Sequence, residues 1–533
     1  MNELVPRGTP DDVRARAALP VRAPVTDPTL GVDVVRNRRG EPPHRLVTIG
    51  DSLSQGMQSA AVFATDLSSA AIVAHELGWL DRFRFPRYPG HGGLPLNLEL
   101  LARDLEERYG SALSAWEVPQ ALFRVRSLMD QIEDYWERGP GSVAPDVPTI
   151  NHALAMYSWD LRDALSRTAA GCAAVIEAPR DHLIGQVVRN HVERAALRVY
   201  PHFSPEASRM TMFDAARTLG QEHDDSTECG IETLVVALGA NNALKTITTL
   251  TVAWSDAGYD DLERKKAFTV WRPEHFAAEL ARVAAAVRAV PARHVIWCTV
   301  PHVTIAPIAR GVGTKVSRGS RYFPYYTRPW ISDDRFDPDR DPHLTAADAR
   351  AIDAAIDLYN AGIERVVEDA RRGIDGRPRD WYLLDLAGLL DRLASRRYIE
   401  DVDARPEWWT PYDLPPALQA LRPVPDSHFL TGDGSGGRAT GGLFSLDGVH
   451  PTTVGYGLLA RELVGVMRGA GVQFRTRSGA PRPDPVDVDF DRLLRRDLLV
   501  RRPPQNITST LDLLDWGNQA LDLFTGLLGF RSF

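Results

Sequence analysis

The stretch Leu46-Val47-Thr48-Ile49-Gly50-Asp51-Ser52-Leu53 contains a run of apolar and β-branched residues that ends at a glycine and an aspartate. Such a run is typical of a buried strand, and the glycine predicts a tight turn after it. Residues 57–78 follow with alanine, leucine, valine and glutamate at a density typical of a helix. The sequence therefore predicts a strand, a turn that carries Ser52, and a helix.

The same alternation of apolar strands and helices continues along the chain. Further strands are predicted at 147–151, 233–238, 294–300 and 381–386, and helices at 159–165, 273–290, 345–370 and 451–467. Because these strands are continuously apolar, we expect a parallel sheet covered by helices on both faces. The predicted fold class is α/β, a three-layer α/β/α sandwich with a five-stranded, mostly parallel sheet.

These elements occupy only part of the 533 residues, which leaves two terminal segments and several insertions. We predict an extended N-terminal tail over 1–43, a core domain over 44–475 and a C-terminal extension over 476–533. Apolar residues and aspartates alternate over 511–530, which favours an amphipathic helix that docks on the core or on a second subunit. Insertions that could be lids, substrate walls or extra packing layers are expected at about 80–146, 170–230, 245–270, 302–344 and 395–440.

Composition excludes several classes of protein. A net charge of −8 and a pI near 6.0 argue against a nucleic-acid binder. Cys172, Cys229 and Cys298 are far apart, so neither a disulfide framework nor a zinc site is predicted, and no cofactor or metal is expected. The chain shows no transmembrane run and no apolar segment typical of a signal peptide. A cytoplasmic location is therefore expected.

Two further motifs supply the groups that a serine nucleophile needs. Asp447-Gly448-Val449-His450 places a carboxylate three residues before an imidazole. On a tight turn this spacing lets the carboxylate hold Nδ1–H of His450, which leaves Nε2 to take a proton from Ser52. Gly239-Ala240-Asn241-Asn242 follows a strand, so Asn241 is expected at the carboxyl edge of the sheet, where ligands bind in such folds. Its amide could donate to an oxyanion.

These motifs resemble those of the GDSL, or SGNH, hydrolases, a family of serine esterases and lipases, over about 45–470 of the chain. The resemblance implies a flavodoxin-like sheet and an acyl-enzyme on Ser52, with His450 as base and Asp447 as its orienting acid. It implies that the Ser52 N–H and the Asn241 amide both serve the oxyanion hole. Asn242 stands where the family has an aspartate, which predicts a shifted loop and not a loss of chemistry.

The family's second backbone donor is a glycine that follows the second strand. The matching stretch here is Asn151-His152-Ala153-Leu154-Ala155-Met156, so Met156 occupies that position. A backbone N–H survives a change of side chain where φ need not be positive. Gly92 and Gly93 are alternative donors, but they precede the second strand, so topology favours Met156.

The leading hypothesis is a hydrolase that cleaves carboxylic esters of small molecules or lipids. Two alternatives stay open. An acyltransferase would use the same triad to pass the acyl group to an alcohol, and long aromatic insertions that exclude water would favour it. A non-catalytic binding or scaffold protein would explain Met156, Asn242 and the insertions without chemistry. A homo-oligomer could form through the C-terminal extension.

Overall fold

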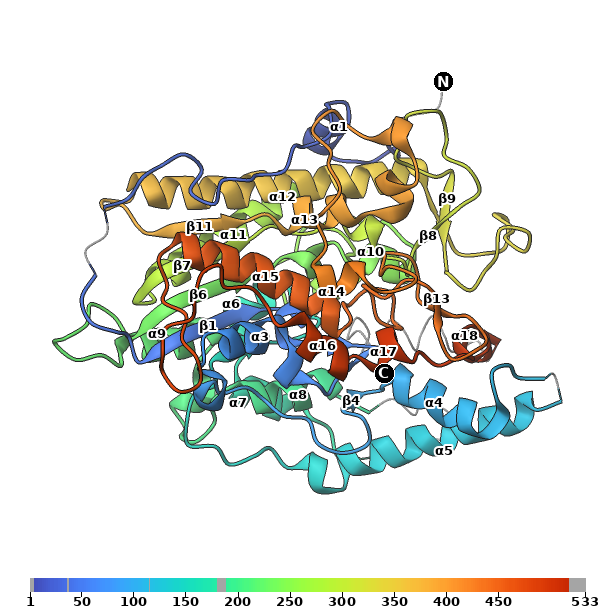
Figure 1. The fold of residues 1–533 in the computed structure, drawn as a ribbon, viewed down its shortest axis with the longest axis horizontal. Coiled ribbons are helices and arrows are strands. Elements are labelled where there is room, and N and C mark those ends of the chain that lie inside the picture. Colours follow the sequence, from blue (N-terminus) through green and yellow to red (C-terminus); the bar gives the residue numbers. More distant parts are fainter. Residues whose placement is uncertain (1–3, 36–37, 115, 180–187, 517–533) are drawn as a thin grey trace.

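A five-stranded sheet forms the centre of the computed structural model, which describes residues 4–35, 38–114, 116–179 and 188–516 (Figure 1). Every neighbouring pair of strands in this sheet is parallel. The strand order is β11 (Trp381–Leu384), β7 (Ala292–Cys298), β6 (Ile231–Ala237), β1 (His44–Gly50) and β5 (Ala153–Ala155). The predicted α/β class and five-stranded parallel sheet are confirmed.

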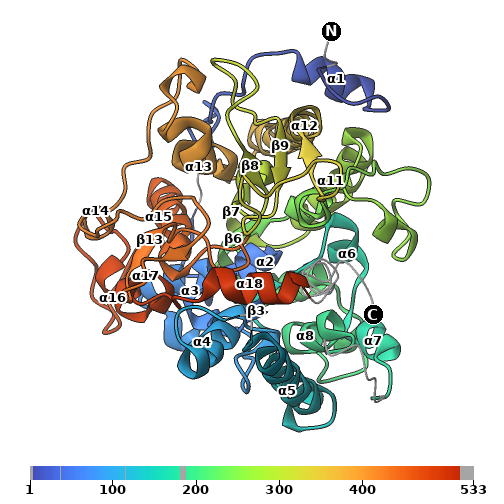
Figure 2. The ribbon, with the colours of Figure 1, turned by 90° about the vertical axis from the view of Figure 1, so that its right-hand side faces the viewer.

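Helices pack on both faces of this sheet. On one face α3 (Ser69–Glu76) and α15 (Thr453–Gly469) contact each other and the strands β1 and β11. The other face carries α6 (Leu161–Ser166), α9 (Met212–Gln221), α11 (Pro273–Arg288) and α12 (Ala346–Arg372). Figure 2 shows α3 and α15 on one side of β6 and β7 and α6, α11 and α12 on the other. The arrangement is that of a three-layer sandwich.

Local sequence signals fix the ends of the longest helix, α12. The hydroxyl of Thr345 accepts a hydrogen bond from the Asp348 N–H, and the Asp348 carboxylate accepts one from the Thr345 N–H. This reciprocal pair satisfies two N–H groups that the first turn leaves without acceptors. Gly373 ends the helix in the left-handed conformation. The predicted helix over 345–370 therefore agrees with the observed one to within two residues.

Two predicted elements differ from the structure. The second strand is β5, not 147–151, because Pro148 has no N–H for a ladder and the Ile150 carbonyl accepts a hydrogen bond from Arg84. The helix predicted over 57–78 is replaced in its first part by a hairpin of β2 (Met57–Gln58) and β3 (Ala61–Val62). Only α3 is helical there, after the short 3-10 turn η1 (Thr65–Leu67).

The insertions form their own secondary structure around the core. In Figure 1, α4 (Leu98–Tyr109) and α5 (Val118–Glu137) lie along the lower edge of the molecule. Further helices are α7 (Ala169–Val175), α8 (His191–Val199), α10 (Lys245–Thr249), α13 (Leu386–Leu393) and α14 (Pro416–Gln419). Short strands are β4 (Leu94–Pro95), β8 (Arg310–Val312), β9 (Tyr325–Thr327), β10 (Leu344–Thr345), β12 (Thr431–Gly432) and β13 (Arg438–Thr440).

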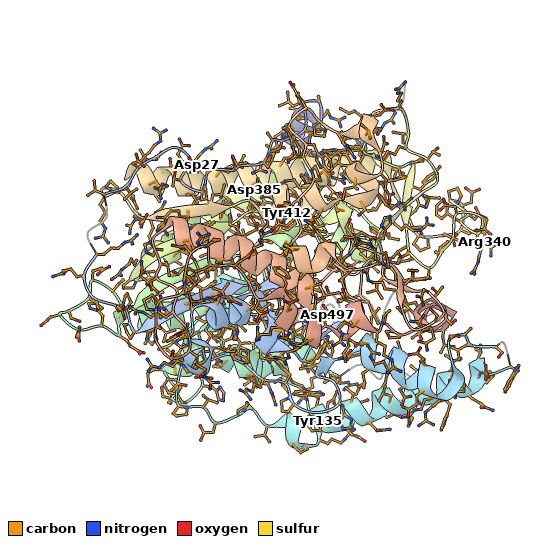
Figure 3. The ribbon with its side chains drawn as sticks, in the orientation of Figure 1. Asp27, Tyr135, Arg340, Asp385, Tyr412 and Asp497 are labelled. Atoms are coloured by element: carbon orange, nitrogen blue, oxygen red, sulfur yellow. The ribbon has the colours of Figure 1, made fainter. Side chains whose placement is uncertain are left out.

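The N-terminal segment is not a simple extended tail as predicted. It contains α1 (Asp11–Ala17), which packs on α12, and Arg22 then pairs with Glu364 and Asp385. Asp385, labelled in Figure 3, follows β11 and also accepts hydrogen bonds from the Val25 N–H and the Thr299 hydroxyl. The segment is therefore held at the carboxyl edge of the sheet by one buried carboxylate.

The C-terminal extension begins with α16 (Phe490–Arg496), which packs on α15, and α17 (Leu498–Arg501), which packs on α16. Asp497, labelled in Figure 3, accepts hydrogen bonds from the N–H groups of Val454 and Val500, and burial raises its pKa to about 6. The predicted terminal helix is α18 (Ile507–Trp516), which contacts α4 and β12. The remainder of the predicted helix, over 517–530, lies outside the described residues.

Within the described ranges, no helix is both long enough and apolar enough to cross a membrane.

Replacing Asp385 by alanine should destabilise the protein by about 3 kcal/mol, because Arg22 would lose its buried carboxylate partner and keep only the partly exposed Glu364. Urea unfolding would measure this loss. The matched control is Asp403→Ala, which removes the exposed partner of Arg318 and should change the unfolding midpoint little. Equal shifts in the two variants would contradict the structural role of Asp385.

Candidate active site

Ser52 lies at the carboxyl end of β1, as the first residue of the short helix α2 (Ser52–Gln55). The Asp51 side chain caps this helix by accepting a hydrogen bond from the Leu53 N–H, and burial raises the pKa of Asp51 to about 6. Gly50 is required because a β-carbon there would lie 2.2 Å from the Ser54 hydroxyl oxygen. The turn is thus tight, and Ser52 is held in one place at the sheet edge.

Asp447 and His450 lie on one turn before α15, and both are buried, with exposed fractions of 0% and 1%. Asp447 Oδ2 lies 2.9 Å from His450 Nδ1, and Oδ1 accepts hydrogen bonds from the N–H groups of Val449 and His450. Burial alone would raise the pKa of Asp447, but the attraction of His450 and these hydrogen bonds outweigh it and lower the pKa. The turn therefore holds an ionised carboxylate against the imidazole.

The hairpin β2–β3 holds the same carboxylate from the other side. Ser59 and Ala60 at its tip have positive φ values of 48° and 62°, which are unusual for residues other than glycine. The Ala60 N–H donates to Asp447 Oδ2 at 2.7 Å, and the Ser59 N–H donates to the Ser445 hydroxyl at 2.8 Å. Strained backbone of this kind persists where surrounding contacts fix it, and it gathers at functional sites. Ser59, Ala60 and Ser445 are site residues that the sequence reasoning missed.

The second nitrogen of His450 is in a different environment. His450 Nε2 is buried and has no hydrogen-bond partner among the described residues. Ser52 and His450 line the same pocket, which we call the Ser52 pocket and whose cavity volume is about 110 Å³. A buried polar atom without a partner is costly, so this nitrogen is set up to accept a proton or a hydrogen bond from a group in the pocket.

The Ser52 pocket is otherwise almost entirely apolar. Leucines from three parts of the chain contribute to its wall: Leu386, Leu389, Leu390 and Leu393 on α13, Leu443 before the Asp447 turn, and Leu458 and Leu459 on α15. Val303, Ala306 and Phe444 are among the other apolar lining residues. Such a pocket fits a hydrocarbon group, with the polar atoms of Ser52 and His450 at its edge.

Asn241 lies beside this pocket and not in its wall. It belongs to the 3-10 turn η5 (Ala240–Asn242), and its side-chain amide donates to the Trp159 carbonyl at 2.8 Å. Its neighbour Ala240 lines the Ser52 pocket, whereas Asn241 lines an adjoining polar pocket of about 100 Å³. The amide carries a second hydrogen that this bond does not use.

Asn242 is completely buried, and its side chain makes a structural contact. Its Oδ1 accepts a hydrogen bond from the Leu161 N–H at the start of α6, at 3.4 Å. Its backbone carbonyl accepts one from the Trp271 N–H. Asn242 thus joins the turn η5 to the helix layer beneath it.

Met156 does not have a free N–H. That group donates to the Gly50 carbonyl at 3.1 Å and extends the pairing of β5 with β1. The Gly93 N–H is likewise used, by the Gly90 carbonyl within the turn before β4, and Gly92 lies in the same turn. The Met156 N–H is therefore already paired in the sheet, and its role as an oxyanion donor stays a prediction, since a donor must aim its hydrogen at the reacting oxygen.

His302 lines the Ser52 pocket, but both of its nitrogens are occupied. Nδ1 lies 3.2 Å from Asp391 and Nε2 lies 3.1 Å from Asp357. Burial would lower the pKa of His302, but the carboxylates of Asp391, Asp353 and Asp357 outweigh it and raise the pKa to about 10. Arg397 pairs with Asp353 at 2.9 Å in the same cluster. This buried ionic layer forms the floor behind the pocket and leaves His302 with no free nitrogen for catalysis.

The three cysteines are free and buried. Over the described ranges no group of three or more histidine, cysteine, aspartate or glutamate side chains has the arrangement of a metal site.

No protein-family model matches the chain, and no curated protein or solved structure matches it either.

The ionic layer predicts how stability depends on pH. With a folded pKa of about 10, His302 contributes its full stabilisation below its ordinary pKa of 6.5 and loses it as the pH rises through about 10. Asp353, with a folded pKa of about 2, contributes its full stabilisation above its ordinary pKa of 3.8 and loses this stabilisation as the pH falls towards 2. The free energy of unfolding should therefore fall between pH 7 and pH 10.

Replacing His302 by glutamine should lower the free energy of unfolding at pH 7 by about 3 kcal/mol, because two buried carboxylates would lose their cation. It should also flatten the alkaline part of the profile. His223→Gln is the control, since His223 is exposed. An unchanged alkaline slope in His302→Gln would show that other groups carry this pH dependence.

Proposed function

We propose that this protein is a serine hydrolase that cleaves carboxylic esters with an apolar acyl group. The observation that carries the proposal is the unpartnered, buried Nε2 of His450, which shares a pocket with Ser52 while Asp447 holds the other nitrogen. A core histidine with a purely structural role normally has both nitrogens satisfied, as His302 has. The resemblance of the three motifs to GDSL hydrolases supports the same chemistry.

In the proposed reaction, Ser52 Oγ attacks the ester carbonyl carbon while His450 Nε2 takes the hydroxyl proton. Asp447 stabilises the imidazolium and keeps its ring oriented. The tetrahedral oxyanion then collapses, the bond from carbon to the alkoxy oxygen breaks, and His450 returns its proton to the leaving alcohol. Water attacks the acyl-enzyme with His450 again as base, which releases the carboxylic acid and restores Ser52.

The oxyanion hole of the proposal consists of the Ser52 N–H and the Asn241 amide. The Ser52 N–H is the first of α2, and the described residues offer it no acceptor. The Asn241 amide has one hydrogen held by Trp159, which fixes its orientation, and a second hydrogen for the substrate oxygen. The N–H of Met156 is left out because the Gly50 carbonyl already accepts it.

The catalytic assignment is tested with p-nitrophenyl esters and a fluorophosphonate probe. Ser52→Ala should lose probe labelling and nearly all ester hydrolysis, whereas Asn241→Ala should keep labelling but lose about 100- to 1000-fold in kcat. Ser68→Ala, which removes the hydroxyl that caps α3, is the matched control and should keep its activity while losing about 1 kcal/mol of stability. A folded wild-type protein that the probe does not label would favour a non-catalytic binding role instead.

The apolar wall predicts which acyl groups enter. Leu389→Trp should fill the Ser52 pocket and reduce kcat/KM for an octanoate ester by about tenfold or more relative to the acetate ester, because overpacking excludes the longer chain. Leu498→Trp, a change of the same kind at an exposed position on α17, should leave the ratio unchanged. A parallel loss of both esters in Leu389→Trp would mean that the acyl chain does not bind among the α13 leucines.

A further inference from the structure

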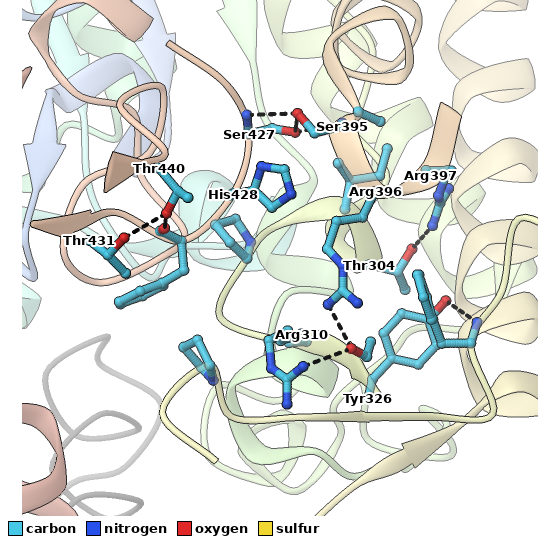
Figure 4. A pocket seen from close by; sticks show the side chains of 18 of the residues that line it. Thr304, Arg310, Tyr326, Ser395, Arg396, Arg397, Ser427, His428, Thr431 and Thr440 are labelled. Atoms are coloured by element: carbon cyan, nitrogen blue, oxygen red, sulfur yellow. Dashed lines mark hydrogen bonds between the residues drawn. The ribbon is translucent and has the colours of Figure 1, made fainter. Parts of the chain in front are cut away.

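A cavity with a volume of about 320 Å³ lies outside the Ser52 pocket. Figure 4 shows it between the loop that carries Thr304 and Arg310, the π-helical turn at 395–399, and the segment from Ser427 to Thr440. Thr508 and Leu511 of α18 also line it. We call it the arginine cavity, because Arg310, Arg321, Arg396 and Arg397 all belong to its wall.

Among the side chains that the structure describes, the wall of the arginine cavity carries basic groups and no carboxylate. His428 joins the four arginines, and no aspartate or glutamate is among these described lining residues. The acidic partners of four of these groups lie behind the wall: Asp333 for Arg310, Asp353 for Arg321 and Arg397, and Asp426 and Glu400 for His428. The surface that faces the cavity is therefore basic, although most of these basic groups pair with carboxylates that do not line the cavity.

Arg396 is the basic group of this wall that lacks a direct carboxylate partner among the described residues. It forms no ion pair among the described residues, and its Nη1 donates to the Gly311 carbonyl at 2.6 Å. Arg310 Nη1 donates to the same carbonyl at 3.3 Å, so the two guanidinium groups converge (Figure 4). Burial and the repulsion of Arg310 lower the pKa of Arg396. An anion in the cavity would relieve both effects, because it would supply the missing charge.

The remaining wall combines hydroxyl groups with apolar surface. Thr431 and Thr440 lie opposite Arg396 in Figure 4, with their hydroxyl oxygens 2.7 Å apart. Phe323, which lies under the Arg396 guanidinium at 4.6 Å, and Phe429 and Trp330 supply aromatic surface. The Thr440 hydroxyl donates to the Phe429 carbonyl, so these hydroxyls are paired within the wall. The cavity thus offers guanidinium donors for an oxyanion and an apolar space for the group attached to it.

We propose that the arginine cavity binds an amphipathic anion, which consists of a phosphate or carboxylate on an apolar or aromatic body. The oxyanion lies against Arg396 and Arg310, where a planar guanidinium can donate two parallel hydrogen bonds. The apolar body lies against the aromatic residues. This site is distinct from the Ser52 pocket and does not depend on the proposed hydrolysis.

A single segment separates the two sites. In residues 303–309, Val303 and Ala306 face the Ser52 pocket, whereas Thr304, Ile305, Pro307 and Ala309 face the arginine cavity. The Ile308 N–H donates to the Gly448 carbonyl within the Asp447 turn at 3.0 Å. A ligand of the arginine cavity would therefore lie one segment away from the base His450.

Isothermal titration calorimetry of the full chain tests the site with phenyl phosphate, benzoate and benzyl alcohol. We expect one equivalent of an aromatic anion to bind, and the neutral alcohol to bind about tenfold more weakly or not at all. Added salt should lower the affinity for the anion. Inorganic phosphate alone should bind more weakly than phenyl phosphate, because it lacks the apolar body. The comparison of phenyl phosphate with benzoate identifies which oxyanion is preferred.

Three variants locate the binding. Arg396→Gln should lower the affinity for the anion by about tenfold or more. Arg396→Lys should retain part of the affinity, because the positive charge remains although the planar guanidinium is lost. Arg318→Gln removes an exposed arginine outside the wall and should bind as the wild type does. Leu389→Trp, which fills the Ser52 pocket, should also bind as the wild type does.

Three results would overturn the proposal: no saturable binding of either anion by the wild type, equal binding of benzyl alcohol, or loss of binding in Leu389→Trp but not in Arg396→Gln. The first two need no variant, so they hold even if Arg396→Gln fails to fold. None of the three depends on ester hydrolysis. A failure of the proposed function is detected separately, by the fluorophosphonate experiment.

Discussion

The carboxylate of Asp447 is completely buried, and the arrangement of the candidate site depends on how its charge is satisfied. A buried carboxylate costs several kcal/mol unless hydrogen bonds and a cation replace its water. Here the donors come from two distant parts of the chain, Ala60 at the tip of the β2–β3 hairpin and the Val449–His450 turn. The same requirement that keeps Asp447 ionised therefore holds the strained hairpin, the turn and the imidazole in one arrangement. It leaves His450 Nε2 without a partner among the described residues, and His450 lines the same pocket as Ser52.

A second buried ionic layer contacts the Ser52 pocket through His302, which lines it. His302 stands between Asp357 and Asp391, and Arg397 joins the layer through Asp353. The two histidines of the pocket thus have opposite environments, since His302 has both nitrogens held by carboxylates and His450 has one. Arg397 also belongs to the wall of the arginine cavity, so one ionic layer supports both cavities from opposite sides.

How far the sequence could predict the structure depended on the range of the interactions involved. The strands β1, β6 and β7 and the helices α11 and α12 were predicted within a few residues, because apolar runs and capping residues are local signals. The hairpin at 57–62 was predicted as helix, since Ser59 and Ala60 adopt positive φ only under the hold of Ser445 and Asp447, almost 400 residues away. Met156 was assigned as a donor because a sequence does not show that its N–H already pairs with Gly50.

By itself, the sequence determined the α/β class, the parallel sheet and the spacing of Asp447 to His450, because periodicity and short turns depend only on neighbouring residues. The convergence of Ser52 and His450 on one pocket was implied by motif order, but the form of that pocket was decided by tertiary structure. Only the fold could decide that leucines of α13 and α15 line that pocket and that both nitrogens of His302 are paired. The same holds for the four arginines that share one wall, where no described side chain is a carboxylate. The physical reason is that burial and charge pairing are set by contacts between residues far apart in the chain, and no local pattern encodes them.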